Sequence, residues 1–392
     1  MSPASRIYLD HNATTPIRPE VLEAMLPYLR EHFGNPSSIH AYGQGVRKAL
    51  EEARIRVASL MGTADPGNVL FTSCGTESNA LAIQGAAFSA WERSQGKKKH
   101  LLLSSVEHDG VMEIGRALRR RGFEIGLIPV DGHGRVNPRE VASSLRSETV
   151  LVSVMHANNE IGTLQPIRDI ALLCREREVL FHSDAVQSAG KIPISVEEWG
   201  VDILSLSGHK LNAPKGVGAL YVRKGLPLAA VVPGHQERNR RGGTENVASI
   251  VGLGRACELA LKEMPGRDGR LKDLRRHLEE GLLSRIPRCR VNGHPTERLD
   301  NTVHLGIEDV EGQALVIALD LEGIAASSGA ACSSGAVESS HVVSAIGLSP
   351  SFARGTLRLS LGWGNTKEEI DRALEVIPRC VERLRRLAPV HR

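Results

Sequence analysis

The stretch from residue 179 to residue 222 reads VLFHSDAVQSAGKIPISVEEWGVDILSLSGHKLNAPKGVGALYV. It contains three short apolar segments, Val179–His182, Ile203–Leu206 and Gly218–Val222. Short apolar runs bounded by turn signals are typical of strands that are buried on both faces. Two of these segments lead directly into reactive side chains, Asp184 after the first and Lys210 after the second. We therefore expect a buried sheet that presents a carboxylate and an amine at its strand ends.

The same alternation extends back along the chain to Val69. Four more apolar segments predict strands at Val69–Thr72, Leu101–Ser104, Glu124–Pro129 and Thr149–Met155. Between most of the strands lie segments with helical spacing, such as Leu164–Glu178. Another helix is predicted to begin at Asn137-Pro138, where Asn caps and Pro takes the first helical position. Strands separated by helices predict a mostly parallel sheet that is covered on both faces.

After about residue 245 the chain changes to long, charged helical segments separated by short strands. The helices are expected at Asn246–Met264, Arg270–Ile286 and Thr366–Leu387, and the strands near Thr302–Leu305, Ile324–Ala326 and Thr356–Leu361. The segment Pro265–Gly269 contains residues that interrupt helices. We therefore expect the first two helices to be separate, and a second, smaller α/β domain to begin near residue 260.

Composition narrows the class of protein. The 392 residues are 41% apolar and 24% charged, which is an ordinary globular profile. A net charge of +4 and only 3% aromatic residues do not favour direct nucleic-acid binding. Six cysteines without a C-x-x-C pair disfavour a disulfide framework or a zinc site. No signal peptide or membrane span is evident, so we expect a cytoplasmic protein without a membrane contact or a resident metal.

Candidate functional residues lie where predicted strands end, which is where open parallel sheets bind ligands. Gly75-Thr76 opens a helix, so its N–H groups could bind an anion, or it could be an ordinary turn. Asp184 needs a partner, either a cationic ring nitrogen or a nearby Arg or Lys. Lys210 would be a Schiff-base nucleophile if it were desolvated, although most lysines are solvated. An anion site, an acid for a ring nitrogen and an amine tether are together what pyridoxal phosphate (PLP) requires.

Four further residues carry open alternatives. His108 could stack on a planar ring and move protons, or be structural. Asn159, in the pair Asn158-Asn159, could donate to a ligand or form a turn. Cys332 lies in a run of small residues, where a thiol could be reachable or could be inert. Arg358 lies in an apolar strand-like run and needs an anion, either a substrate carboxylate or an internal Asp or Glu.

Motifs along nearly the whole chain resemble those of the cysteine desulfurases, most closely the nitrogenase-associated NifS-like branch. They lie at Tyr8–Pro16, Phe33–Ser38, Phe71–Ser78, Asn158–Glu160, Ser207–Lys210, Arg240–Asn246, around Cys332 and at Arg358–Gly362. The resemblance implies the fold of type I PLP-dependent transferases (aspartate-aminotransferase-like). In that fold a mostly parallel seven-stranded sheet forms a large domain beside a smaller α/β domain. The implied division is an N-terminal arm at 1–15 that packs with the small domain, a large PLP-binding domain at 16–260, and a small domain at 261–392 that carries the Cys332 loop.

The resemblance also implies how the cofactor would be held. Lys210 would bind PLP covalently, Asp184 would pair with the ring nitrogen, Gln187 would approach the ring hydroxyl, and His108 would stack on the ring. The phosphate would be bound by Gly75, Thr76, Ser207 and His209, and by Thr244 of the other subunit of a homodimer.

The implied reaction takes sulfur from L-cysteine and releases L-alanine. Asn159, which would also contact the cofactor, and Arg358 would position the substrate carboxylate. Cys332 would be the nucleophile and His108 would help to transfer protons. The persulfide on Cys332 would pass to an iron–sulfur scaffold protein, with which Cys332 would transiently ligate a cluster. Both a housekeeping role and a role in nitrogen fixation fit the motifs.

Two departures and three alternatives accompany this expectation. Ala330 stands where relatives often have Ser, and the sequence ends without the longer tail of some relatives, which weakens the expectation of scaffold docking. A selenocysteine lyase could share every site residue. A transaminase would have no need of Cys332, and a non-catalytic sulfur carrier would have no need of Lys210.

Overall fold

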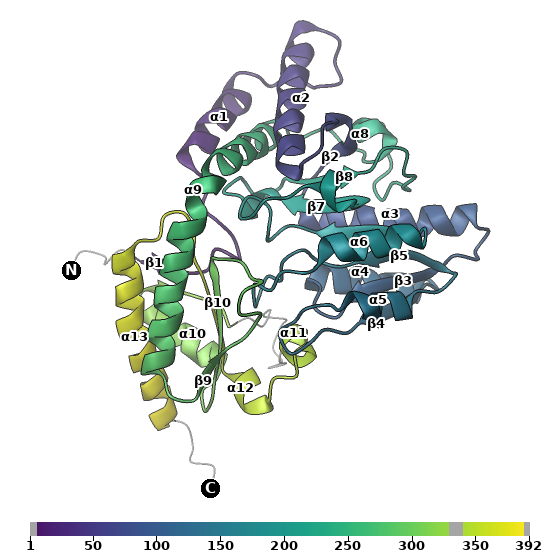
Figure 1. Ribbon diagram of the computed structural model, residues 1–392. Helices are drawn as coiled ribbons and strands as arrows, with labels where there is room; N and C mark the ends of the chain where they lie inside the picture. The colour runs from purple at the N-terminus through teal and green to yellow at the C-terminus, as the bar shows by residue number, and fades with distance from the viewer. Residues whose placement is uncertain (1–5, 329–339, 388–392) are drawn as a thin grey trace.

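The computed structural model describes residues 6–328 and 340–387, and the side chains of residues 265–268 are not described. Its main sheet has seven strands in the order β2-β8-β7-β6-β5-β3-β4 (Figure 1). They are β2 (Val69–Thr72), β3 (His100–Ser104), β4 (Glu124–Ile128), β5 (Thr149–Ser153), β6 (Leu180–Asp184), β7 (Ile203–Ser207) and β8 (Gly218–Val222). Only β8 runs antiparallel to its neighbours β2 and β7, and the other pairs are parallel. The predicted mostly parallel, seven-stranded sheet is confirmed.

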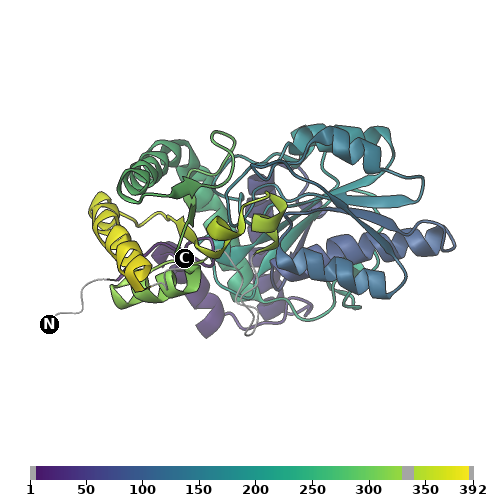
Figure 2. The same ribbon diagram turned by 90° about the horizontal axis from the view of Figure 1, so that it is seen from below.

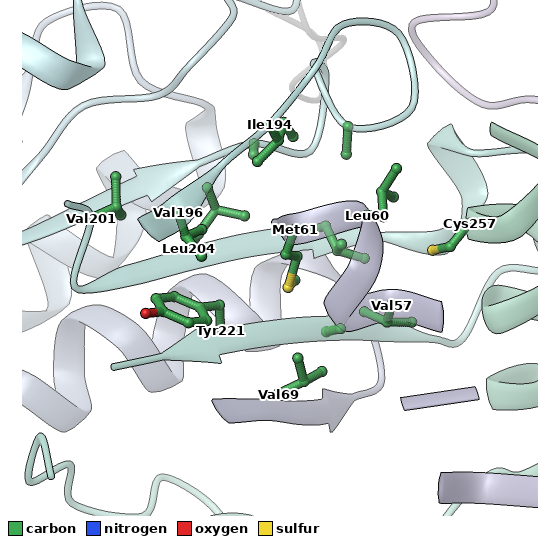
Figure 3. Close-up of a cluster of buried hydrophobic side chains, with 14 of the residues drawn as sticks. Val57, Leu60, Met61, Val69, Ile194, Val196, Val201, Leu204, Tyr221 and Cys257 are labelled. Carbon is green, nitrogen blue, oxygen red and sulfur yellow. The ribbon is translucent and has the colours of Figure 1, made fainter. Parts of the chain in front are cut away.

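Helices cover both faces of this sheet, as Figure 2 shows from below. Successive side chains of a strand point to opposite faces. Leu101 and Leu103 of β3 accordingly pack with α3 (Gly75–Arg93) and α4 (Asp109–Arg120), whereas Leu102 belongs to the core on the other face. That second core includes residues of α2 (Ala41–Met61), α5 (Pro138–Ser144) and α6 (Ile167–Glu176). Figure 3 shows part of it, with Val57 and Met61 of α2 beside Leu204 and Tyr221 of the sheet.

A second, three-stranded antiparallel sheet forms the other part of the molecule. Its strands are β9 (Cys289–Val291), β10 (Thr302–Ile307) and β12 (Thr356–Ser360), with β10 in the centre. They share a separate core with α10 (Gly312–Leu321) and α13 (Lys367–Leu387). The N-terminal β1 (Ile7–Tyr8) pairs in parallel with β11 (Ile324–Ala325), and Leu9 is buried in the same core. Segments from both ends of the chain therefore complete this core.

One helix, α9 (Val247–Arg285), joins the two parts. The expectation of two separate helices, interrupted at Pro265–Gly269, is wrong: the helix continues through this segment. Figure 1 shows that α9 first runs beside α1 (Pro19–Arg30) and α2 and then turns to run beside α13. A proline inside a helix removes one hydrogen bond and bends the axis, but it need not end the helix. Here packing on both sides of the bend stabilises the helix.

The other elements are short. They are η1 (Pro66–Asn68), α7 (Val196–Trp199), η2 (Gly208–Lys210), α8 (Gln236–Asn239), α11 (His341–Ala345) and α12 (Pro350–Arg354). The predicted cap of α5 is confirmed, since the Asn137 side chain accepts a hydrogen bond from the Arg139 N–H at 3.0 Å. Over the described ranges, every helix is too short or too polar to cross a bilayer.

Candidate active site

A cavity of about 330 Å³ lies at the strand ends of the main sheet. Nine of the residues predicted to bind the cofactor line it together: Gly75, Thr76, His108, Asn159, Asp184, Gln187, Ser207, His209 and Lys210. They end β6 and β7 or come from segments that follow β2, β3, β5, β6 and β7. Because the carboxyl ends of parallel strands meet at one edge, residues far apart in sequence form one site.

The N-terminus of α3 forms one end of the cavity. Gly75 and Thr76 are its first residues, where backbone N–H groups have no partner within the helix and attract anions. A Cβ at Gly75 would lie 2.9 Å from Val186 Cγ2 and 3.2 Å from Ser207 Cβ, so a side chain would fill this space. The buried Ser207 Oγ has no hydrogen-bond partner among the described residues. The arrangement fits a phosphate group, which would supply an acceptor for Ser207.

Asp184 ends β6 and is 4% exposed. Within the described ranges its two hydrogen bonds come from uncharged donors: Asn79 Nδ2 to Oδ2 at 2.7 Å and the Val186 N–H to Oδ1 at 2.9 Å. Among the described residues, Asp184 therefore does not form the ion pair with Arg or Lys that was the alternative expectation. A buried carboxylate that lines a cavity, with no ion pair in direct contact among the described residues, fits a cationic ring nitrogen.

Lys210 lies in η2 and is half-buried, unlike an ordinary surface lysine. Its Nζ donates to the main-chain oxygens of Asn12 and Ala13, the latter at 2.7 Å. Burial, followed by the positive charge of Arg358, lowers the pKa of Lys210 to about 8. An amine that loses its proton this readily is suited to forming a covalent link to an aldehyde. Burial lowers the pKa of the neighbouring His209 to about 4, so its imidazole is neutral near pH 7.

Arg358 of β12 lies beside the cavity and brings the second sheet to the site. One guanidinium nitrogen donates to the Asn159 main-chain oxygen at 3.1 Å, and the other pairs with Asp10 at 2.9 Å. Of the two anions expected for Arg358, the internal carboxylate is therefore present, and it belongs to Asp10. Arg358 Nε is buried without a partner among the described residues, so the side chain keeps donor capacity for a substrate carboxylate.

His108 and Glu107 follow β3 and have different surroundings. His108 lines the cavity, and its Nδ1 accepts a hydrogen bond from the Gly110 N–H at 3.0 Å as the cap of α4. Glu107 is fully buried, and Oε1 accepts from Ser104 Oγ and the Met155 N–H at 2.6 and 2.7 Å. Burial raises the pKa of Glu107 to about 8, so this carboxyl group is neutral at pH 7.

Of the described residues that were predicted to form the site, Thr244 and Arg358 do not line this cavity. Thr244 lines a separate cavity of about 240 Å³ with Ser73 and Arg241. An ion pair of 2.8 Å between Arg241 and Glu77 holds this segment against α3. Cys332 and Ala330 lie outside the described residues.

Sequence reasoning missed several residues that hold the site together. Asn12 is 1% exposed: its main-chain oxygen accepts from Gln187 Nε2 at 2.8 Å, and its side chain donates to Thr302 Oγ1 at 2.9 Å. Lys191 donates to Gln187 Oε1 at 2.9 Å. Asn79 and Lys191 each lie four positions after a predicted site residue, Gly75 and Gln187. Helical spacing places Asn79 on the same face of α3 as Gly75 and could have indicated it, whereas Lys191 lies in a turn, where this spacing does not apply.

These features together fit PLP. The cavity offers an anion site, a buried carboxylate, a reactive amine and a histidine on its wall. Its volume suits a small cofactor. Across residues 6–328 and 340–387, the structure has no group of three or more His, Cys, Asp or Glu side chains placed to hold a metal ion.

Comparisons with known proteins agree with this site. Residues 7–373 match the family described as Aminotransferase class-V. Proteins named Cysteine desulfurase IscS from Methanosarcina thermophila and Dictyoglomus turgidum are 48% and 47% identical to this chain, covering 98% of it and 94% and 96% of their own lengths. A solved structure described as a NifS-like protein is similar with a TM-score of 0.89 and 36% identity, over 96% of this chain and 99% of its own. SspA in complex with cysteine is similar with a TM-score of 0.80 and 34% identity, over 91% of this chain and 98% of its own.

Proposed function

Because this chain belongs to the class-V aminotransferase family of PLP-dependent enzymes, we propose that it is a cysteine desulfurase. It converts L-cysteine and the thiol of Cys332 to L-alanine and a persulfide on Cys332. The observation that carries the proposal is the single cavity that joins Lys210, Asp184 and the α3 N-terminus, with Arg358 beside it. The relatives named cysteine desulfurase match 98% of the chain and support cysteine as the substrate of this PLP site.

Bound PLP supplies an electron sink that stabilises negative charge at the substrate Cα. Gly75, Thr76, Ser207 and His209 bind its phosphate, and Asp184 keeps the ring nitrogen protonated. Lys210 would hold the cofactor, and its amine, when free, would move the Cα proton of the substrate. This role suits a group whose pKa is lowered to about 8.

The substrate is oriented by residues from both sheets. Arg358 and Asn159 bind the cysteine carboxylate, and Asp10 holds Arg358 in place. His108, which lines the cavity, would pack against the cofactor ring and transfer a proton at the substrate sulfur. Cys332 attacks that sulfur: the bond between substrate carbon and sulfur breaks, a sulfur–sulfur bond forms, and a proton completes alanine.

The protein acts as a homodimer in the cytoplasm and passes its sulfur to an iron–sulfur scaffold protein. The position of Thr244 supports the dimer, since it lies outside the cavity of its own chain. Five described cysteines are free thiols, which suits a reducing compartment. We further propose that residues 1–15 are an arm, 16–260 the PLP-binding domain and 261–392 the domain that carries the Cys332 loop.

The decisive experiment compares the wild type, Cys332→Ala and Lys210→Ala after incubation with L-cysteine. Mass spectrometry should detect alanine and one added sulfur on the Cys332 peptide of the wild type. Cys332→Ala should keep the visible absorbance of bound cofactor and lose at least about 100-fold of the sulfide release, because it lacks the nucleophile. Lys210→Ala should lose both activity and the covalent link.

Other outcomes identify other activities. Normal turnover by Cys332→Ala would exclude the proposal. Formation of a keto acid without sulfide would indicate a transaminase, and a much higher rate with selenocysteine than with cysteine would indicate a selenocysteine lyase. Sulfur transfer that persists in Lys210→Ala would indicate a carrier.

A further inference from the structure

Asn79 is buried in the wall of the cavity and has no role in the reaction steps proposed for the other residues of the site. It lies one helical turn after Gly75 in α3 and is 2% exposed. Nδ2 donates to Asp184 Oδ2 at 2.7 Å, which is a short hydrogen bond to a charged acceptor. Its Oδ1 is buried with no partner among the described residues. The Asn79 amide thus makes its hydrogen bond to Asp184 while its own oxygen stays without a donor, which indicates that the contact with Asp184 fixes its position.

Asp184 depends on few donors. Apart from Asn79, the described residues give it only the N–H of Val186, which lies two positions along its own turn. Hydrogen bonds to an ionised carboxylate favour the ionised form and fix its orientation. Asn79 is therefore the one side chain among the described residues that holds the Asp184 carboxyl group in place by a hydrogen bond.

A second buried carboxyl group, that of Glu107, lies near Asp184 and adds importance to the hydrogen bond from Asn79. Glu107, after β3, is fully buried and close enough to Asp184 for the two charges to repel. Burial, together with this repulsion, raises the pKa of Glu107 to about 8 and keeps Glu107 protonated near pH 7. Glu107 receives both of its hydrogen bonds on Oε1, and Oε2 has no partner among the described residues. Asp184 receives one on each oxygen, and Lys210 adds a favourable charge from η2.

We propose that Asn79 is a positioning residue that holds the Asp184 carboxyl group oriented towards the ring nitrogen of the cofactor. This inference rests on the proposed PLP chemistry and adds a residue to it. Without the amide, the Asp184 carboxyl group would lose its orientation and would hold the proton on the ring nitrogen less firmly.

The test uses the cofactor-loaded full-length protein and three variants. Asn79→Leu removes the donor at similar size. Asn79→Asp keeps the shape and replaces the donor by a second carboxyl group. Gln84→Leu is the matched control, since it removes an amide from the same helix outside the cavity. The readouts are the pH titration of the cofactor's visible absorbance, the cofactor dissociation constant, kcat and KM for cysteine, and Tm.

Asn79→Leu should shift the absorbance titration, weaken cofactor binding about tenfold and lower kcat at least about tenfold, as expected for one lost charged hydrogen bond. KM should change little, because Arg358 and Asn159 are intact. Asn79→Asp should be more impaired than Asn79→Leu at pH 8 and should recover towards pH 5, where the introduced carboxyl group is protonated and can donate to Asp184. Gln84→Leu should behave like the wild type.

The proposal is overturned if Asn79→Leu lowers only Tm while its absorbance titration matches that of the wild type. It is also overturned if Asn79→Asp shows no recovery at low pH. Failure of the proposed function is separately visible, because the absorbance titration requires bound cofactor but no release of sulfide.

Discussion

At the scale of single residues, Glu107 and Asp184 show how burial and hydrogen bonding divide roles between similar side chains. Both are buried after strands of the same sheet. Asp184 has a donor on each oxygen and faces the cavity, whereas Glu107 has an unpartnered Oε2 among the described residues and a pKa raised to about 8 by burial. One carboxyl group is therefore suited to hold a cation and the other is a neutral structural group.

The raised pKa of Glu107 predicts a specific dependence of stability on pH. Between about pH 4.5 and 8 the folded protein holds a proton on Glu107 that the unfolded chain has released. The free energy of unfolding contributed by Glu107 is therefore fully present below pH 4.5 and falls as pH rises, by at most about 1.4 kcal/mol per pH unit. Relative to the wild type, Glu107→Gln should become steadily more stable from pH 5 to pH 8 in urea unfolding.

The exposed Glu92 provides the control for this measurement. Glu92→Gln should differ from the wild type by a constant amount across the same range. A Glu107→Gln variant with an equally constant difference would show that Glu107 ionises normally in the folded protein.

At the scale of elements, the α3 N-terminus depends on the absence of a side chain at Gly75. A Cβ there would be within 2.9 Å of Val186 and 3.2 Å of Ser207, so one of these neighbours must move. Because both line the cofactor cavity, the shift changes the site directly. Because Gly75 has no side chain, a ligand can approach the backbone closely at the start of α3, which an ordinary turn would not require.

Gly75→Ala should weaken cofactor binding at least about tenfold, because the added methyl group narrows the phosphate end of the cavity. The dissociation constant can be measured by titrating cofactor-free protein and following absorbance. The control is Gly45→Ala in α2, where a Cβ meets nothing within 4 Å and affinity should not change. Equal affinities of the two variants would show that the phosphate does not bind at this turn.

At the scale of the whole molecule, an apolar surface lies where α1 and α2 meet. This α1–α2 patch consists of Leu29, Phe33, Ile39 and Tyr42, and Ile39 is 93% exposed. Phe33 and Tyr42 stack with ring centroids 5.6 Å apart, so these two rings form one surface. Large exposed patches of this kind mark interaction sites. The patch lies at one end of the molecule, as Figure 1 shows for α1 and α2, and supports the proposed homodimer.

A charged residue in the α1–α2 patch should therefore favour the monomer. Ile39→Asp should lower the dimer fraction in sedimentation experiments, because dimerisation would bury the charge. It should also weaken cofactor binding if Thr244 contacts the partner's phosphate. Leu127→Asp, at another exposed leucine on β4, is the control and should stay dimeric. An unchanged dimer in Ile39→Asp would place the interface elsewhere.

The sequence by itself determined the alternation of strands and helices and the residues at the strand ends. Strand positions such as Val69–Thr72 and Gly218–Val222 follow from short apolar runs, because fully buried strands need apolar side chains on both faces. Gly75, Asp184 and Lys210 could be selected because strand ends in such a sheet meet at one edge. Local rules failed at Pro265–Gly269, where packing of α9 on both sides outweighed the interruption.

Only the tertiary structure decided which partners these residues have. Asp184 is paired with Asn79, 105 positions away, and not with an Arg or Lys. Arg358 is paired with Asp10, 348 positions away. The low pKa of Lys210 and the high pKa of Glu107 arise from burial, which depends on the packing of many segments. Sequence spacing reports what lies one helical turn or one strand away, whereas desolvation and long-range hydrogen bonds exist only once the two sheets are assembled.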